Sequence, residues 1–149
     1  MFHGVRALDP PSAVVLRTAA ARVPRAVSGL AARTAGAVPC IGDGSNHWAL
    51  VHVDDIAELY VLALNAPAGS VYAGVSGQNP PLTYVTRALG QAAGCPGRID
   101  SLTLEEAVQR MGPIAEAFAL DQQFSGAKAR RELGWTPTRL DALAELAQG

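Results

Sequence analysis

The chain has 149 residues, of which 49% are hydrophobic and 17% are charged, and its formal net charge is −1. This length and composition are typical of one globular domain with its own hydrophobic core, and they exclude a disordered chain. A net charge this close to zero provides no basic field, so we expect neither nucleic acid nor an acidic membrane surface as a partner.

The first third of the chain predicts two strands separated by a helix. Apolar runs with β-branched residues indicate buried strands at residues 13–17 and 38–41. Between them lies an Ala/Arg-rich stretch with proline near its start and glycine just after its end, which predicts a helix over residues 23–35. The sequence Gly-Asp-Gly at residues 42–44 then predicts a turn.

The stretch from residue 45 to residue 64, SNHWALVHVDDIAELYVLAL, predicts a strand that leads directly into a helix. Hydrophobic alternation favours a strand over residues 49–53. Asp54 or Asp55 is expected to cap the helix, because a carboxylate there accepts hydrogen bonds from unpaired N–H groups. The face of the helix that we expect to be buried holds Ile56, Leu59, Tyr60, Ala63 and Leu64.

The rest of the chain continues the alternation of strands and helices. Thr103 and Glu106 have the spacing of a capping box, and Ser125 is expected to cap a helix that stops at Gly134. Strands are predicted at residues 70–75 and 98–102, and further helices at residues 83–93, 113–118 and 141–147. This alternation places the chain in the α/β class.

The glycines at the predicted turn do not predict a dinucleotide site. The third glycine of that fingerprint would fall at His47, and the stretch leads into a strand rather than into the helix that receives a pyrophosphate. A metal site of His47 and His52 with Asp54 and Asp55 is disfavoured, because an odd separation places the two histidines on opposite faces of a strand. We therefore expect no metal, and we interpret His52 as a half-buried strand residue.

Three further features bear on location and sites. No apolar run approaches a membrane span, and MFHGVRALDP lacks the apolar stretch of a signal peptide, so a soluble, cytoplasmic protein is predicted.

Cys40 and Cys95 are expected to be free thiols, with a single disulfide as the alternative. Arg17 and Arg22 flank a strand end, where α/β proteins bind ligands, although arginine usually faces the solvent.

Taken in order, several segments resemble the C-terminal half of an extended short-chain dehydrogenase/reductase, the NAD-dependent epimerase/dehydratase family. VVLRT resembles the family's strand ending in Arg-Pro, and CIGDGSNHWALVHVDDIAELYVLAL resembles its Gly-Asp-Gly turn and Val-Asp-Asp strand end. SVYAGVSG resembles the next strand, and FSGAKARRELGWTP resembles the closing signature. The resemblance implies the last strands of a partial Rossmann-like sheet plus the small C-terminal substrate domain.

The sequence departs from that family where the family's chemistry lies. The Gly-x-x-Gly-x-x-Gly loop is absent, and no tyrosine is followed four residues later by a lysine. Phe124 precedes Lys128 by four residues, but a phenyl ring has no proton to exchange. We therefore expect residues 1–149 to be a single domain or fragment without the N-terminal cofactor-binding half and without a catalytic residue, and whether the chain is itself an enzyme stays open.

The resemblance implies roles for five residues. Arg17 and Thr18 correspond to the nicotinamide side of a cofactor, NAD or NADP, and Arg22, His47 and Trp48 to the substrate side. Trp48 stands where nucleotide-sugar members carry an arginine on a phosphate, and an indole cannot pair with a diphosphate. A smaller or less charged carbonyl or alcohol is therefore the expected substrate.

Two functional hypotheses result. In the first, the chain is the substrate-side portion of an NAD(P)-dependent epimerase/dehydratase-like oxidoreductase, is not itself catalytic, and does not bind the cofactor tightly alone. In the second, it is a free-standing non-catalytic module that self-associates or binds a partner chain, because half a sheet leaves an exposed edge and an uncovered apolar face. The expected partners are a small-molecule substrate and either further copies of the chain, as a homo-oligomer, or the missing N-terminal half.

Overall fold

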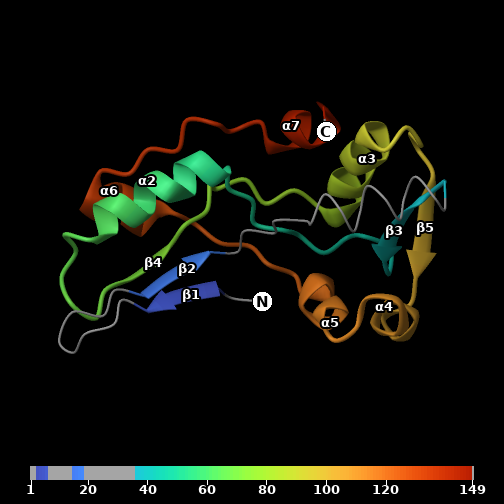
Figure 1. Ribbon diagram of the computed structural model, residues 1–149, viewed down its shortest axis with the longest axis horizontal. Coiled ribbons are helices and arrows are strands. Elements are labelled where there is room, and N and C mark those ends of the chain that lie inside the picture. The colour runs from blue at the N-terminus through green and yellow to red at the C-terminus, as the bar shows by residue number, and fades with distance from the viewer. Residues whose placement is uncertain (1–2, 7–14, 19–35, 149) are drawn as a thin grey trace. The chain divides into compact units, whose positions relative to one another are not determined.

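The computed structural model describes residues 3–6, 15–18 and 36–148, and the chain divides into two compact units (Figure 1). The first unit comprises residues 1–20, 49–79 and 123–140, and the second comprises residues 21–48, 80–122 and 141–149. Strands and helices alternate along the chain, which confirms the α/β class. The helix predicted over residues 23–35 lies outside the described residues.

The first unit contains a three-stranded sheet in the order β1-β2-β4. β1 (His3–Arg6) runs antiparallel to β2 (Val15–Thr18), and β2 runs parallel to β4 (Val71–Ala73). The predicted strands at residues 13–17 and 70–75 are thus confirmed with shifted bounds. β1 was not predicted from the sequence, because the four residues HGVR carry no apolar alternation.

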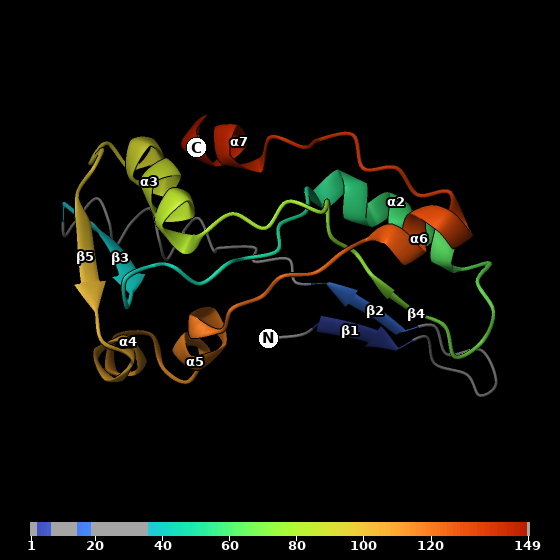
Figure 2. The same ribbon diagram turned by 180° about the vertical axis from the view of Figure 1, so that it is seen from behind.

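Two helices, α2 (Val53–Ala63) and α6 (Ala127–Leu133), lie side by side over this sheet (Figures 1 and 2). Their shared core consists of Ile56, Leu59, Ala63, Tyr72, Ala129 and Trp135. α6 ends at Gly134, whose φ of 66° is the left-handed conformation that glycine adopts readily. The predicted cap at Ser125 is wrong by one residue: the N-cap is Gly126, and the Ser125 hydroxyl accepts a hydrogen bond from the N–H of Ala127 at 3.3 Å.

The predicted strand at residues 49–53 is wrong. The segment has no strand partner: the N–H of Leu50 donates to the carbonyl of Gln78, and the carbonyl of Leu50 accepts from the N–H of Ser76, but no ladder forms along its neighbours. α2 instead begins at Val53, so the period-two pattern of the sequence belongs to an extended approach to the helix.

The capping predictions for α2 are also wrong. His52 is the N-cap rather than a strand residue, and its Nδ1 accepts from the N–H of Asp54 at 3.1 Å. Asp54 and Asp55 lie in the first helical turn, where their charges still favour the positive end of the helix. Leu64, predicted to be buried, is the C-cap residue of α2 and is 80% exposed.

Asp55 is fully buried and joins α2 to the segment that follows α6. Its carboxylate accepts from the N–H and the hydroxyl of Thr138, both at 3.2 Å, and from the N–H of Arg139 at 3.0 Å. Its backbone carbonyl accepts from the indole N–H of Trp135 at 2.8 Å. The guanidinium of Arg139 lies 3.7 Å from Asp55 and 3.1 Å from Asp54. The buried charge is therefore both hydrogen-bonded and paired.

The second unit contains a parallel pair of strands, β3 (Val38–Ile41) and β5 (Ile99–Leu102). Its helices are α3 (Leu82–Ala92), α4 (Leu104–Met111), α5 (Ile114–Ala119) and α7 (Ala142–Gln148). These elements confirm the predicted ones to within one or two residues at each end. The capping box of Thr103 and Glu106 is also confirmed, with both reciprocal hydrogen bonds present.

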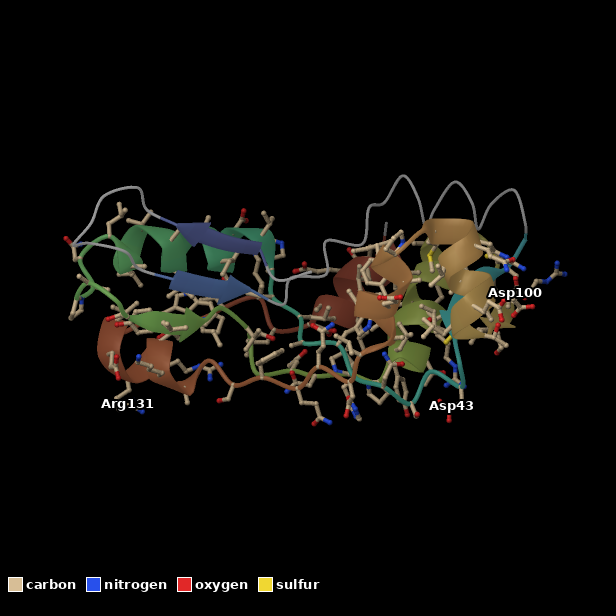
Figure 3. The ribbon with its side chains drawn as sticks, turned by 90° about the horizontal axis from the view of Figure 1, so that it is seen from below. Asp43, Asp100 and Arg131 are labelled. Atoms are coloured by element: carbon tan, nitrogen blue, oxygen red, sulfur yellow. The ribbon has the colours of Figure 1, made fainter. Side chains whose placement is uncertain are left out.

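The turn at Gly42, Asp43 and Gly44 is confirmed, and Asp43 is labelled in Figure 3. The turn and the residues after it cap α3. The carbonyls of Gly44 and Asn46 accept from the first N–H groups of that helix, those of Thr83 at 3.0 Å and Leu82 at 2.7 Å. Gly44 has a φ of 70°, and a Cβ there would lie 2.7 Å from Sγ of Cys40. Backbone carbonyls therefore replace the side-chain cap that α3 lacks.

Both cysteines of the second unit are free and buried, as predicted. Burial raises the pKa of the Cys40 thiol, and this outweighs a hydrogen bond with Thr86 that lowers it.

In the part of the chain that the structure describes, no helix combines the length and apolar character needed to cross a membrane.

Replacing Asp55 by alanine is expected to lower the free energy of unfolding by about 3 kcal/mol, because three part-buried donors lose the fully buried carboxylate that accepts from them and Arg139 loses a partner. Urea unfolding followed by circular dichroism measures the change. The matched control is Asp54→Ala, which removes an exposed carboxylate from the same turn and should cost no more than about 1 kcal/mol. Equal losses in the two variants would contradict the structural role assigned to Asp55.

Candidate functional site

His47 is held at three points in the second unit. Its backbone N–H and its ring Nδ1 lie 2.8 and 2.9 Å from the same carboxylate oxygen, Oδ1 of Asp121. Its carbonyl accepts from the N–H of Gln122 at 2.8 Å. The side chain is 31% exposed, so the imidazole is fixed in place and still meets solvent.

The residues on either side of His47 bond to α5 and to its C-cap residue, Leu120. The indole N–H of Trp48 donates to the carbonyl of Phe118 at 3.0 Å, and the two aromatic rings lie 5.2 Å apart in a tilted arrangement. The side-chain amide of Asn46 donates to the carbonyls of Phe118 and Leu120. These bonds make the support of His47 rigid. Trp48 is itself buried in this support, and its contact with a substrate stays a prediction.

Asp121 and Asn46 were not singled out in the sequence analysis. Asp121 lies 74 residues after His47, and no spacing rule links residues so far apart. The signal that was available is weak: Asp121 opens the polar run Asp-Gln-Gln between two apolar stretches.

The two residues implied on the cofactor side lie in β2 of the first unit. Arg17 is in register with Gly4 of β1 and with Ala73 of β4, and Thr18 is the last residue of the strand. The carboxyl ends of parallel strands are where open α/β sheets bind ligands. Arg22, implied on the substrate side, lies outside the described residues.

The segment after β4 is fixed by Ser76, at the same end of the sheet. The hydroxyl of Ser76 donates to the carbonyl of Leu50 at 2.8 Å, and its own carbonyl accepts from the guanidinium of Arg130. Gly77, with a φ of 94°, follows directly, and a Cβ there would lie 3.3 Å from Arg130. The segment that follows β4 is therefore held in place by the hydrogen bonds of Ser76 to Leu50 and Arg130.

The N-termini of the three longest described helices are already occupied. α2 is capped by His52 and carries Asp54 and Asp55 in its first turn, and α3 is capped by the Gly-Asp-Gly loop. α4 has its capping box, in which hydrogen bonds from Thr103 lower the pKa of Glu106. A phosphate at any of these termini would have to displace a cap or approach a carboxylate.

The described residues also do not assemble a metal site. Among them, no three His, Cys, Asp or Glu side chains gather closely enough to hold an ion. His47 contacts Asp121 in the second unit, whereas His52 contacts Asp54 in the first.

The comparisons with known sequences give two fungal relatives. An uncharacterized protein of Schizosaccharomyces pombe is 32% identical over 117 residues, which cover 78% of this chain and 39% of the relative. An uncharacterized protein of Saccharomyces cerevisiae is 31% identical over 116 residues, covering 77% of this chain and 38% of the relative. The chain thus spans about two fifths of the length of these curated relatives. No protein-family model matches it.

Solved structures of epimerases and dehydratases share the fold. The human epimerase family protein SDR39U1 with NADPH matches at a TM-score of 0.69 and 21% identity, over 95% of this chain and 50% of that one. UDP-glucose 4-epimerase of Thermotoga maritima matches at 0.65 and 20% identity, over 91% and 43%. DesIV, a dTDP-glucose 4,6-dehydratase of Streptomyces venezuelae with NAD bound, matches at 0.61 and 24% identity, over 85% and 37%. The fold implied by the sequence resemblance is therefore confirmed.

Proposed function

We propose that this chain is the substrate-side portion of an NAD(P)-dependent oxidoreductase of the epimerase/dehydratase type. The observation that carries the proposal is the shared fold, since solved structures with this fold hold NAD or NADPH. The proposed substrate is a small carbonyl compound or alcohol, and the hydride would be carried by the cofactor. Within residues 1–149 the sequence supplies no Tyr-x-x-x-Lys pair, so the proposal gives this chain binding and orientation rather than proton transfer.

Arg17 and Thr18 are the proposed contacts to the nicotinamide end of the cofactor. Their place at the carboxyl end of β2, beside the parallel β4, supports this role. His47 is the proposed substrate contact in the second unit, supported by Trp48, and Arg22 is proposed as a second substrate residue from the sequence resemblance alone. The occupied helix N-termini support weak binding of the dinucleotide, because its affinity rests largely on the pyrophosphate at a helix N-terminus.

An NMR titration with NADPH and NADH tests this proposal. We expect binding weaker than micromolar, with amide shifts concentrated at Thr18 and Ala73 and none at the first turn of α3. Arg17→Ala should abolish these shifts. Arg131→Ala, which removes an exposed arginine of α6 in the same unit, is the matched control and should leave them unchanged (Figure 3). Micromolar or tighter binding would contradict the proposal, and shifts centred on residues 42–44 would place a phosphate site at that turn.

The alternative function, a non-catalytic module that self-associates, is favoured by one observation. α2 is apolar on a second face, where Val53 is 62% exposed, Val61 is 65% exposed and Leu64 is 80% exposed. Ala57 lies between them on the same face. A helix that is apolar on two faces is typical of one covered on both.

Light scattering on the purified chain over a range of concentrations distinguishes this alternative. If α2 mediates self-association, the wild type should be an oligomer, and Val61→Glu should shift it toward a monomer by placing a charge in the contact. Leu104→Glu changes an exposed leucine of the second unit and serves as the control. A wild-type chain that stays monomeric at every concentration would eliminate the self-associating module.

A further inference from the structure

Arg130 is a cation of the first unit that no carboxylate of the described residues neutralises. α6 carries three cationic side chains and a single carboxylate. That carboxylate, Glu132, lies 2.9 Å from the guanidinium of Arg131 and 3.9 Å from Nζ of Lys128. Arg130 is exposed and forms no ion pair within the described ranges. Exposed arginines are common, so the informative observation is the place at which this guanidinium is held.

The guanidinium of Arg130 lies against the backbone that follows β4. Its Nη2 donates to the carbonyl of Ser76, a buried residue whose hydroxyl donates to Leu50. A Cβ on Gly77 would lie 3.3 Å from Nη2, 3.8 Å from Nη1 and 4.0 Å from Cζ of the same guanidinium. The guanidinium therefore occupies the space that a side chain at Gly77 would need. The bond to Ser76 uses one N–H group of the guanidinium and leaves the others for solvent or a ligand.

This place is the carboxyl end of the parallel strands β2 and β4. β2 ends at Thr18 and β4 ends at Ala73, and Arg130 contacts the chain just beyond β4. α6 brings the arginine there because its N-cap, Gly126, packs closely on this backbone. A Cβ on Gly126 would lie 2.6 Å from the carbonyl oxygen of Val75 and 3.6 Å from that of Ala73. Open α/β sheets bind their ligands outside the carboxyl ends of their strands.

We propose that Arg130 is a binding residue at this edge of the sheet, and that the group it binds is a carboxylate of the substrate. A guanidinium and a carboxylate carry single opposite charges, and their planar forks form two parallel hydrogen bonds. The substrate assigned by this contact is a small carbonyl compound or alcohol that carries a carboxylate.

The inference rests on the proposed function and narrows the substrate class named there. A hydride passes only between groups that lie in contact, so the substrate of the proposed enzyme lies beside the nicotinamide. The nicotinamide end of the cofactor is assigned to Arg17 and Thr18, at the same strand ends that Arg130 reaches. A charged group of the substrate is therefore within the part of the chain that the proposed function already uses.

The surroundings of Arg130 favour a carboxylate over a phosphate. A pyrophosphate is normally received by several N–H groups of a helix N-terminus. α2, the longer of the two described helices of the first unit, has Asp54 and Asp55 in its first turn, which disfavour an anion there. Arg130 provides one charge and one rigid fork, which suit a single carboxylate. We expect this contact to change the affinity by about tenfold.

An NMR titration of the wild-type chain with lactate and lactamide tests the inference, because the two molecules share the alcohol and differ in the carboxylate. We expect saturable shifts of the side-chain N–H signals of Arg130 and of the amide of Gly77. Half-saturation should need about tenfold less lactate than lactamide. Inorganic phosphate should bind more weakly than lactate.

Two variants of Arg130 separate binding from a structural role. Arg130→Gln removes the charge and the fork, so lactate should bind no better than lactamide. Arg130→Lys keeps the charge without the fork and should retain part of the preference. A change in local structure alone would weaken both molecules alike and leave the preference unchanged. Arg131→Gln is the matched control, since it removes the same charge from an exposed arginine of the same helix, and it should keep the preference (Figure 3).

Equal binding of lactate and lactamide by the wild type overturns the inference, whether or not the variants fold. Tighter binding of phosphate than of lactate overturns the assigned ligand class, and an equal loss of preference in Arg130→Gln and Arg131→Gln overturns the assignment to Arg130. These titrations contain no cofactor, so they can fail while the NADPH titration succeeds. The NADPH titration can likewise fail while lactate binds at Arg130, so the two failures are distinguishable.

Discussion

The buried carboxylate of Asp55 is the constraint on which the first unit depends. Removing a charge from water costs several kcal/mol unless hydrogen bonds and an opposite charge replace the lost hydration. Here the backbone of residues 138–139 and the guanidinium of Arg139 replace it. Because these groups lie more than 80 residues after Asp55 in the sequence, satisfying one charge also closes the core formed by α2, β4, α6 and Trp135.

The same acidic turn disfavours an anion at the N-terminus of α2. With Asp54 and Asp55 at the start of α2, the positive end of that helix is compensated from within, and it offers nothing to a pyrophosphate. In the second unit, the carbonyls of Gly44 and Asn46 accept from the first N–H groups of α3, so these groups are also not available to a phosphate. The candidate binding features are the imidazole of His47 in the second unit and the carboxyl ends of two parallel strands in the first.

The features that the sequence predicted are local ones. β3, α3 and the capping box of Thr103 and Glu106 follow from runs of a few residues, and they were located closely. The strand expected at residues 49–53 failed because Trp48, Ala49 and Leu50 are all buried, so burial does not alternate, and because the bonds of Leu50 to Gln78 and Ser76 do not extend into a ladder. His52 is the N-cap of α2 because its ring nitrogen accepts a hydrogen bond from a backbone N–H, as the carboxylate of an aspartate would. Asp55 is therefore not the cap, and its side chain is buried.

The candidate site is formed by contacts between residues far apart in the sequence, and no local sequence pattern predicts such contacts. His47 was identified through a family resemblance, but its partner Asp121 is 74 residues away, in the segment after Phe118, whose carbonyl accepts from Asn46 and Trp48. Likewise, nothing near Asp55 in the sequence indicates that Thr138 and Arg139 will bind it. Tertiary partners of this kind are set by the path of the whole chain, so a single sequence reveals one member of the pair without the other.

Native-state hydrogen exchange tests the role of Asp55 most directly. The N–H groups of Thr138 and Arg139 and the indole N–H of Trp135 all bond to this one residue, in a segment that has no regular secondary structure. If the buried carboxylate holds the first unit together, all three should exchange slowly and with the same free energy of opening as the core amides of α2. Exchange of Thr138 and Arg139 at the rate of an unstructured peptide, while α2 stays protected, would contradict this account.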